Sequence, residues 1–174
     1  MGKVILAGAG PGDMGLLTLK AYKYIREADC LVYDRLMSPK LLELARTDCE
    51  LIYVGKENHK HVVNQDGINE ILFQKSKQHE LVLRLKGGDP YVFGRGGEEA
   101  LYLTERGVSV ELVPGVSSSI AALTDAGIPI THRGVAKGFQ VITAHSRKDE
   151  EADIDYSLLT DETITCVFLM GLQH

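Results

Sequence analysis

The chain has 174 residues, of which 44% are apolar and 25% charged, a composition typical of a folded α/β protein of one or two domains. Its net charge of −5 argues against a protein whose main task is nonspecific binding to nucleic acid or to an anionic membrane. No apolar run approaches transmembrane length, and Met1 leads directly into a strand without room for a signal peptide, so we expect a cytoplasmic protein.

Five apolar, β-branched runs predict strands, at residues 4–7, 31–33, 51–54, 81–85 and 108–113. Thr18 is the expected N-cap of the first helix, whose buried face should carry Ala21, Tyr22, Ile25 and Ala28. A short helix is expected at residues 39–45, another from about 66, and a fourth from about 97 to 106.

Asp66 is the expected cap of the third of these helices, and Glu98 and Glu99 are expected as charges in the first turn of the fourth. Strands that alternate with helices in this way predict a parallel five-stranded sheet with helices on both faces.

The pattern changes after Pro114. A helix capped by Ser117 or Ser118 is expected at Ser119–Ala126, followed by an extended segment and by two further strands, at Gly138–Ala144 and Thr165–Met170. We therefore expect residues 1–114 to form an N-terminal α/β domain, and residues 115–174 to form the first part of a second α/β domain.

The three cysteines, Cys30, Cys49 and Cys166, lie far apart in apolar runs. Their odd number and wide spacing favour reduced core thiols over disulfides or a zinc site. His59 and His61 could bind a metal, but no third ligand stands at a suitable spacing, and a basic loop is the favoured interpretation. The sequence therefore predicts no metal site.

The stretch at residues 81–101 breaks from a strand into a loop with five glycines: Gly87, Gly88, Gly94, Gly96 and Gly97. Such glycines let a backbone approach a bound molecule closely. Asp89 lies among them, and a carboxylate at the carboxyl end of a strand can bind a hydroxyl or an amine. The alternative interpretation is an elaborate turn.

The loop after the first strand suggests a nucleotide cofactor. Gly8 and Gly10 fit the dinucleotide-binding pattern G-x-G-x-x-G, with Asp34 as the ribose-binding acid, but its third position is Asp13. Pro11 also lacks the backbone donor that a pyrophosphate needs. An adenosyl ligand without phosphates fits this loop better, and a nucleotide-cofactor oxidoreductase stays as the alternative.

Asp34 and Lys56 follow adjacent predicted strands. Each alone is more often a solvated loop charge, but together they could act as a base and an acid that tune each other's pKa. Basic side chains beside the same strand ends favour a small substrate with several carboxylates; they are Arg35, Arg95, His132 and Arg133.

Seven segments combine in order along the chain: Val4–Asp13, Tyr33–Leu36, Val54–Lys56, Arg84–Glu99, Val113–Ser118, Gly127–Arg133 and Val167–Gly171. In this combination the sequence closely resembles the tetrapyrrole methylase family, and within it the uroporphyrinogen-III C-methyltransferases. The run Gly87–Glu99 is specific to these members, whereas other methylases of the fold share little more than Gly88, Asp89 and Pro90.

The resemblance implies the tetrapyrrole methylase fold, with two α/β domains, the active site in the cleft between them and usually a homodimer. It implies that S-adenosylmethionine, which leaves as S-adenosylhomocysteine, methylates two ring carbons of uroporphyrinogen III. The product, precorrin-2, leads to sirohaem and cobalamin.

The resemblance also assigns roles to matching positions. Asp34 matches the family's proton acceptor and Lys56 its proton donor, while Arg95 and Arg35 are the expected contacts of substrate carboxylates. The expected cofactor contacts are Pro11, Gly87, Gly88, Asp89, Val92, Ser117, Ser118 and Met170.

The family's second domain continues past the position of Met170 with a helix and further strands. On this ground a C-terminally truncated chain is expected, which binds S-adenosyl ligands weakly and turns over poorly. A folded module that binds without catalysis is the non-enzymatic alternative.

Overall fold

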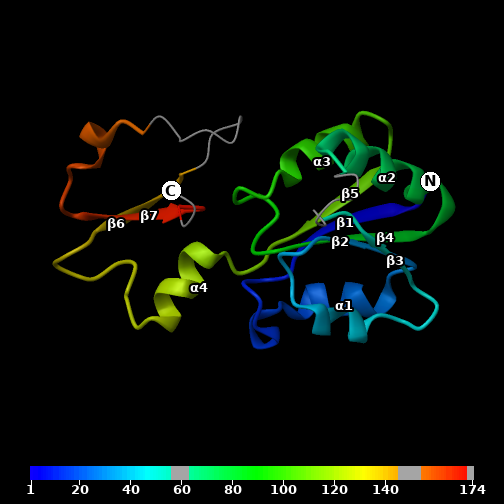
Figure 1. Cartoon of the computed structure of the whole chain (residues 1–174), viewed down its shortest axis with the longest axis horizontal. Helices are drawn as coiled ribbons and strands as arrows, with labels where there is room; N and C mark the ends of the chain where they lie inside the picture. The colour runs from blue at the N-terminus through cyan, green and yellow to red at the C-terminus, as the bar shows by residue number, and fades with distance from the viewer. Residues whose placement is uncertain (56–62, 145–153, 172–174) are drawn as a thin grey trace. The chain divides into compact units, whose positions relative to one another are not determined.

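The computed structural model describes residues 1–55, 63–144 and 154–171 (Figure 1). The chain divides into two compact units, Met1–Ser117 and Ser118–His174. Among the described residues, no helix has both the length and the apolar character needed to cross a lipid bilayer.

The first unit is built on a parallel sheet of five strands in the order β3-β2-β4-β1-β5. The strands are β1 (Lys3–Gly8), β2 (Cys30–Tyr33), β3 (Glu50–Tyr53), β4 (Leu81–Lys86) and β5 (Ser109–Val113). The predicted parallel five-stranded sheet is therefore confirmed.

Helices cover both faces of this sheet, as predicted. Helix α1 (Leu19–Glu27) and the 3-10 helix η2 (Pro39–Leu44) lie on one face, and helices α2 (Gln65–Gln78) and α3 (Gly96–Thr104) on the other (Figure 1). A second 3-10 helix, η1 (Met14–Leu16), precedes α1.

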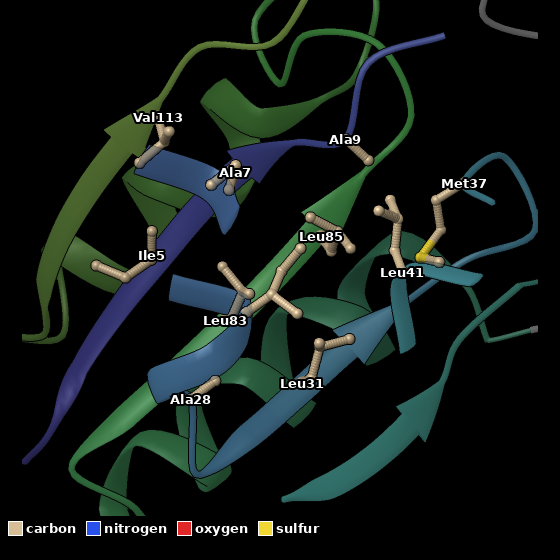
Figure 2. Close-up of a cluster of buried hydrophobic side chains, with 12 residues drawn as sticks. Ile5, Ala7, Ala9, Ala28, Leu31, Met37, Leu41, Leu83, Leu85 and Val113 are labelled. Carbon is tan, nitrogen blue, oxygen red and sulfur yellow. The ribbon is translucent and has the colours of Figure 1, made fainter. Parts of the chain in front are cut away.

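Each face of the sheet has its own apolar core, because alternate residues of a strand point to opposite faces. On the α1 face, Leu83 and Leu85 of β4 pack with Leu31 of β2 and Ile5 of β1 (Figure 2). Val82 of β4 points to the α2 and α3 face instead. Burying each large aliphatic side chain contributes about 2 kcal/mol.

The start of α1 was predicted correctly, but one residue of its buried face was not. The Thr18 side chain accepts a hydrogen bond from the Ala21 amide at 3.1 Å, which confirms it as the N-cap. Ala21 and Ile25 are fully buried, whereas Tyr22 is 38% exposed and Tyr24 packs against the core. One position along a helix turns a side chain by about 100°, which carries Tyr22 off the buried face.

The cap of α2 is Asn64 and not Asp66. The Asn64 side chain accepts a hydrogen bond from the Gly67 amide at 2.8 Å, and Asp66 lies in the first helical turn. Asn and Asp both favour the N-cap position, so residue type alone does not distinguish Asn64 from Asp66. The backbone does, because an N-cap residue is not yet helical and Asn64 is still extended.

The second unit contains helix α4 (Ser118–Asp125), the 3-10 helix η3 (Tyr156–Leu159) and the strands β6 (Gly138–Thr143) and β7 (Ile164–Leu169). The two strands pair in parallel, and they match the predicted strands to within one residue at each end.

All three cysteines are free thiols, as predicted. Cys30 is fully buried, and burial raises the pKa of its thiol to about 12. Cys49 and Cys166 are half-buried.

Candidate functional site

The carboxyl ends of the five strands bring the predicted site residues of the first unit to one edge of the sheet. Asp34 follows β2, and β2 is the neighbour of β4, which leads into Gly87, Gly88 and Asp89. Pro11 follows β1 on the other side of β4. Lys56, the predicted proton donor, lies outside the described residues, as do His59 and His61.

Three backbones meet at this edge without side chains between them. A Cβ atom added at Gly8 would lie 2.4 Å from the carbonyl oxygen of Gly88 and 2.6 Å from Cα of Gly115. One added at Gly115 would lie 2.2 Å from the same oxygen. We call Gly8, Gly88 and Gly115 the glycine crossing. At Gly8 and Gly115 there is no room for any other residue.

The first loop uses its amides within the sheet. The Ala9 amide donates to the Lys86 carbonyl at 2.7 Å, and the Gly10 amide to the Gly88 carbonyl at 3.2 Å. Pro11 has no amide hydrogen. These positions therefore cannot bind a pyrophosphate in the way that a dinucleotide-binding loop does, and the geometry disfavours the oxidoreductase alternative.

Asp89 ties the loop after β4 to the loop after β5. Its Oδ1 accepts a hydrogen bond from the Tyr91 amide at 2.8 Å, and its Oδ2 from the Gly115 amide at 3.0 Å. Both carboxylate oxygens thus bind backbone, a structural role that the sequence did not predict. A cofactor contact by Asp89 stays a prediction.

A small apolar hollow lies beside Asp89. Its volume is about 100 Å³, and its other lining residues are Pro90, Tyr91, Leu112, Val113 and Pro114. Nearby Val92 is 38% exposed. An exposed apolar surface next to a glycine-rich edge can accept the flat face of an aromatic ring.

Asp34 is held at both carboxylate oxygens. Its Oδ1 accepts a hydrogen bond from the Leu36 amide at 3.0 Å, and its Oδ2 from Nη2 of Arg84 at 2.9 Å. The Asp34 side chain keeps 20% of its surface exposed, whereas that of Arg84 keeps 3%. Gly87 packs close to Leu36, because a Cβ added at Gly87 would lie 2.7 Å from Leu36 Cβ. The carboxylate therefore has a fixed orientation and remains accessible.

The two predicted substrate-binding arginines are exposed. Arg95 pairs with Glu98 through two parallel contacts, Nε to Oε1 at 2.9 Å and Nη2 to Oε2 at 2.7 Å, and this carboxylate raises the pKa of Arg95. Arg95 and Phe93 both have left-handed backbones, with φ of 57° and 52°. Left-handed non-glycine residues cost free energy and gather at functional sites.

Glu99 lies in the first turn of α3, as predicted, but it is not a surface charge. It is fully buried, and its Oε1 accepts hydrogen bonds from Lys86 Nζ at 2.8 Å and Arg84 Nε at 3.3 Å. The sequence reasoning missed all three residues. The available signal was the presence of two basic residues, at alternate positions, in an otherwise apolar central strand.

Three predicted cofactor contacts come from the end of the first unit and from the second. Ser117 lies near Gly88, since a Cβ added at Gly88 would be 3.9 Å from Ser117 Cα. Ser118 begins α4, and Met170 follows β7 with a left-handed φ of 62°. His132 and Arg133 are exposed in the second unit. The roles of these residues stay predictions.

The opposite, amino-terminal edge of the sheet carries a cluster of Cys30, Glu50 and His79, whose potential ligand atoms lie within 4.8 Å of one another. Glu50 is already paired with Lys75 at 2.6 Å and with His79 at 2.7 Å. The Cys30 thiol, with its raised pKa, is a poor metal ligand. These contacts favour an ion-pair cluster over a metal site.

Larger hollows, of about 530 and 340 Å³, also lie at that amino-terminal edge. Both are lined mainly by polar residues of the α2–β4 turn, Gln78, His79 and Glu80. They are open surface depressions far from the candidate base, so the small apolar hollow beside Asp89 remains the better candidate for ligand binding.

Comparison with known proteins places the chain in a family. The model of the family "Tetrapyrrole (Corrin/Porphyrin) Methylases" matches residues 3–174. A uroporphyrinogen-III C-methyltransferase of Methanocaldococcus jannaschii is 54% identical over 99% of this chain and 71% of its own length. "Siroheme synthase 2" of Yersinia enterocolitica is 48% identical over 99% of this chain, which spans only 36% of that protein.

Solved structures agree with these sequence relatives. Native uroporphyrin III C-methyltransferase from Thermus thermophilus has a TM-score of 0.83 and 44% identity, over 99% of this chain and 72% of that one. The same enzyme complexed with S-adenyl homocysteine has a TM-score of 0.82 over 99% of this chain and 68% of that one. The chain therefore belongs to the tetrapyrrole methylase family.

Proposed function

We propose that the protein is an S-adenosylmethionine-dependent methyltransferase that methylates uroporphyrinogen III at two ring carbons, yielding precorrin-2 for sirohaem and cobalamin synthesis. The observation that carries the proposal is the juxtaposition, at neighbouring strand ends, of the glycine crossing and the fixed, accessible carboxylate of Asp34. Relatives named uroporphyrinogen-III C-methyltransferase, at 54% and 48% identity, support the choice of substrate.

The methyl donor fits the edge formed by the loops after β1 and β4. Pro11 follows β1, while Gly87, Gly88 and Asp89 follow β4, and together they present backbone and one acid there. Val92 adds an apolar side chain that is 38% exposed. Such a surface suits an uncharged adenosyl group better than a phosphate, because the amides of Ala9 and Gly10 are already used. Ser117 lies near Gly88. Ser118 and Met170 are included as cofactor contacts on the family resemblance alone.

The donor supplies an electrophilic methyl group on a sulfonium. The carbon–sulfur bond breaks as the new carbon–carbon bond forms, and the tetrapyrrole then releases one proton. Asp34 accepts this proton, because its side chain has a fixed orientation and keeps 20% of its surface exposed, whereas both oxygens of Asp89 already accept backbone amides. Lys56 is the proposed proton donor. Most of the acceleration then comes from positioning.

Arg95 and Arg35 are proposed to bind carboxylates of the tetrapyrrole. Arg95 already binds one carboxylate, that of Glu98, through two parallel hydrogen bonds. A substrate carboxylate can replace Glu98 with the same geometry. Arg35 is exposed directly beside Asp34.

The test is an assay of the protein with S-adenosylmethionine and uroporphyrinogen III, following the absorbance of methylated product. We expect slow but measurable turnover by the wild type, and a further loss of at least 100-fold for Asp34→Asn with the Kd for S-adenosylhomocysteine within twofold of wild type. Thermal stabilisation by NAD and not by S-adenosylhomocysteine would favour the oxidoreductase. Binding of S-adenosylhomocysteine without any turnover would favour the binding-only module.

We also propose that the protein is a homodimer and that it is located in the cytoplasm. Support for them comes from the family resemblance alone. Light scattering coupled to size-exclusion chromatography tests the first, and cell fractionation tests the second. A monomer at micromolar concentration would contradict the homodimer.

A further inference from the structure

A network of buried charges lies under the candidate base, on the α2 and α3 face of the sheet. It begins with Arg84 and Lys86, whose side chains keep 3% and 5% of their surface exposed. Both lie on β4, the central strand of the five, on the same face as Val82. Two cations at the centre of a core need buried partners.

Glu99 is the main partner. Its Oε1 accepts hydrogen bonds from Lys86 Nζ at 2.8 Å, from Arg84 Nε at 3.3 Å and from Gln65 Nε2 at 3.3 Å. Its Oε2 is buried and has no hydrogen-bond partner among the described residues. Burial lowers the pKa of Lys86, and the adjacent Arg84 lowers it further.

Arg84 extends from Glu99 to Asp34. While Nε binds Glu99, Nη1 donates to the Leu85 carbonyl at 3.1 Å and Nη2 donates to Asp34 Oδ2 at 2.9 Å. Its guanidinium is thus held at all three nitrogens. Val32 is the register partner of Arg84 on β2, so the side chain runs along the neighbouring strand towards Asp34, two residues further on.

The network is balanced, with two cations, Arg84 and Lys86, and two carboxylates, Glu99 and Asp34. Buried ion pairs are seldom the most stable solution, because apolar side chains of similar volume often stabilise a core as well or better. Stability alone therefore does not account for these charges. Their one accessible member is Asp34.

We propose that Arg84 is a positioning residue that orients the Asp34 carboxylate for proton uptake, and that Glu99 anchors Arg84 in this pose. The proposal rests on the proposed function, in which Asp34 is the proton acceptor. It adds a chain of contacts from the first turn of α3, through β4, to the base at the end of β2. A displacement of the carboxylate by about 1 Å can lower a rate by 100-fold.

The test is a double-mutant cycle of Arg84→Lys and Asp34→Asn. Lysine keeps the charge, but one ammonium cannot reach the three partners of the guanidinium. We expect Arg84→Lys to lower kcat at least tenfold, with KM for S-adenosylmethionine within twofold of wild type. In the Asp34→Asn background, the same change should lower kcat less than twofold further.

Arg46→Lys is the matched control. Arg46 also bridges two carboxylates, Asp29 at 3.2 Å and Asp48 at 2.6 Å, but it lies at the opposite edge of the sheet. Its substitution should leave kcat unchanged. If Arg84→Lys does not fold, Glu99→Gln replaces it, because it keeps the side-chain shape while loosening Arg84. We expect it to lower kcat about threefold or more, and only when Asp34 is present.

The outcomes separate the two proposals. Absence of turnover in the wild type, or full activity of Asp34→Asn, refutes the proposed function or its base. Turnover by the wild type and its loss in Asp34→Asn, with Arg84→Lys equal to wild type, refutes the positioning role alone. Equal losses from Arg84→Lys with and without the Asp34 carboxylate also refute it.

Discussion

At the scale of single residues, Glu111 on β5 has the carboxyl pKa that is shifted furthest among the described residues. Lys20 lies 2.6 Å from its Oε1, Lys3 binds its Oε2, and the Tyr24 hydroxyl donates to it at 3.0 Å. Hydrogen bonds from Lys20 and Lys3 lower the pKa of Glu111 from its ordinary value of 4.5 to about 2. The folded protein therefore holds this charge at a pH where the unfolded chain is protonated.

Stability from Glu111 is present above its unfolded pKa and is lost as pH falls towards its folded pKa, because the unfolded state binds the proton first. The window is therefore pH 4.5 to about 2. We expect Glu111→Gln to lower the free energy of unfolding by about 1 kcal/mol at pH 7, after solvent screening, and by less at pH 3. Urea unfolding at the two pH values measures both quantities.

Glu105→Gln serves as the control for this prediction. The Glu105 side chain is 71% exposed and lies 4.0 Å from Arg106, so its ion pair should contribute little. Unfolding free energies of Glu111→Gln that stay parallel to those of wild type from pH 7 to pH 3 would contradict the assignment.

Asp89 offers a second test at the residue scale, because its two oxygens accept two backbone amides. In Asp89→Asn one side-chain oxygen still accepts a backbone amide. The other oxygen is replaced by an NH₂ group, which faces the second backbone amide and cannot accept its hydrogen bond. We expect a loss of about 1–2 kcal/mol in the free energy of unfolding, measured with urea. Asp13→Asn is the matched change, since the exposed Asp13 accepts one amide, from Gly15. It should cost under about 0.5 kcal/mol, and similar costs for both variants would argue against the tie between loops.

At the scale of elements, the glycine crossing determines how closely the loops after β1, β4 and β5 approach. Gly115→Ala places a methyl group 2.2 Å from the Gly88 carbonyl oxygen, and backbone must move to accept it. We expect a loss of at least about 2 kcal/mol and weaker binding of S-adenosylhomocysteine. Thermal unfolding and calorimetry measure the two effects.

Gly97→Ala is the control for the crossing. Gly97 lies in α3, and a Cβ atom there would meet nothing within 4 Å. Alanine is the better helix former, so this variant should be as stable as wild type or more stable, by up to about 1 kcal/mol. If Gly115→Ala and Gly97→Ala both left stability unchanged, the close approach of the loops at the glycine crossing would not matter for folding, and the prediction would be wrong.

Most elements could be predicted because their signals are local. Strands such as β4 follow from a short apolar run that ends at glycines, and the start of α1 follows from Thr18 with the apolar spacing behind it. Asp34 and the glycine loop could likewise be placed at one edge, since carboxyl ends of parallel strands lie together.

The rest depended on contacts distant in sequence. Glu99 reads as a first-turn helix charge until Arg84 and Lys86, 15 and 13 residues earlier, are placed against it. The second bond of Asp89 likewise depends on Gly115, 26 residues later. Local periodicity does not contain such pairings, and for Glu99 it predicted only a charge in the first turn of the helix.

At the scale of the whole molecule, the two units differ in how many of their side chains are buried. The first has two apolar clusters on a sheet of five strands. In the described part of the second, Val167 is the buried residue of its two strands, and Ser119 and Ala121 are those of α4. Isolated two-stranded sheets are marginally stable.

Hydrogen exchange should therefore distinguish the units. We expect amides of β1 and β4 to exchange only through global unfolding, and those of β6 and β7 to exchange about 100-fold faster through local opening. Strand β3 is the internal control, because it is an edge strand of the larger sheet and is half-buried in the same way. Mass spectrometry of exchanged peptides makes the comparison. The parallel pairs of both sheets have hydrogen bonds of the same kind. If β3 is protected from exchange much better than β6, the difference in protection therefore comes from the apolar cores that the two sheets cover. Equal protection of β6 and β1 would show that the smaller unit unfolds only with the rest of the molecule.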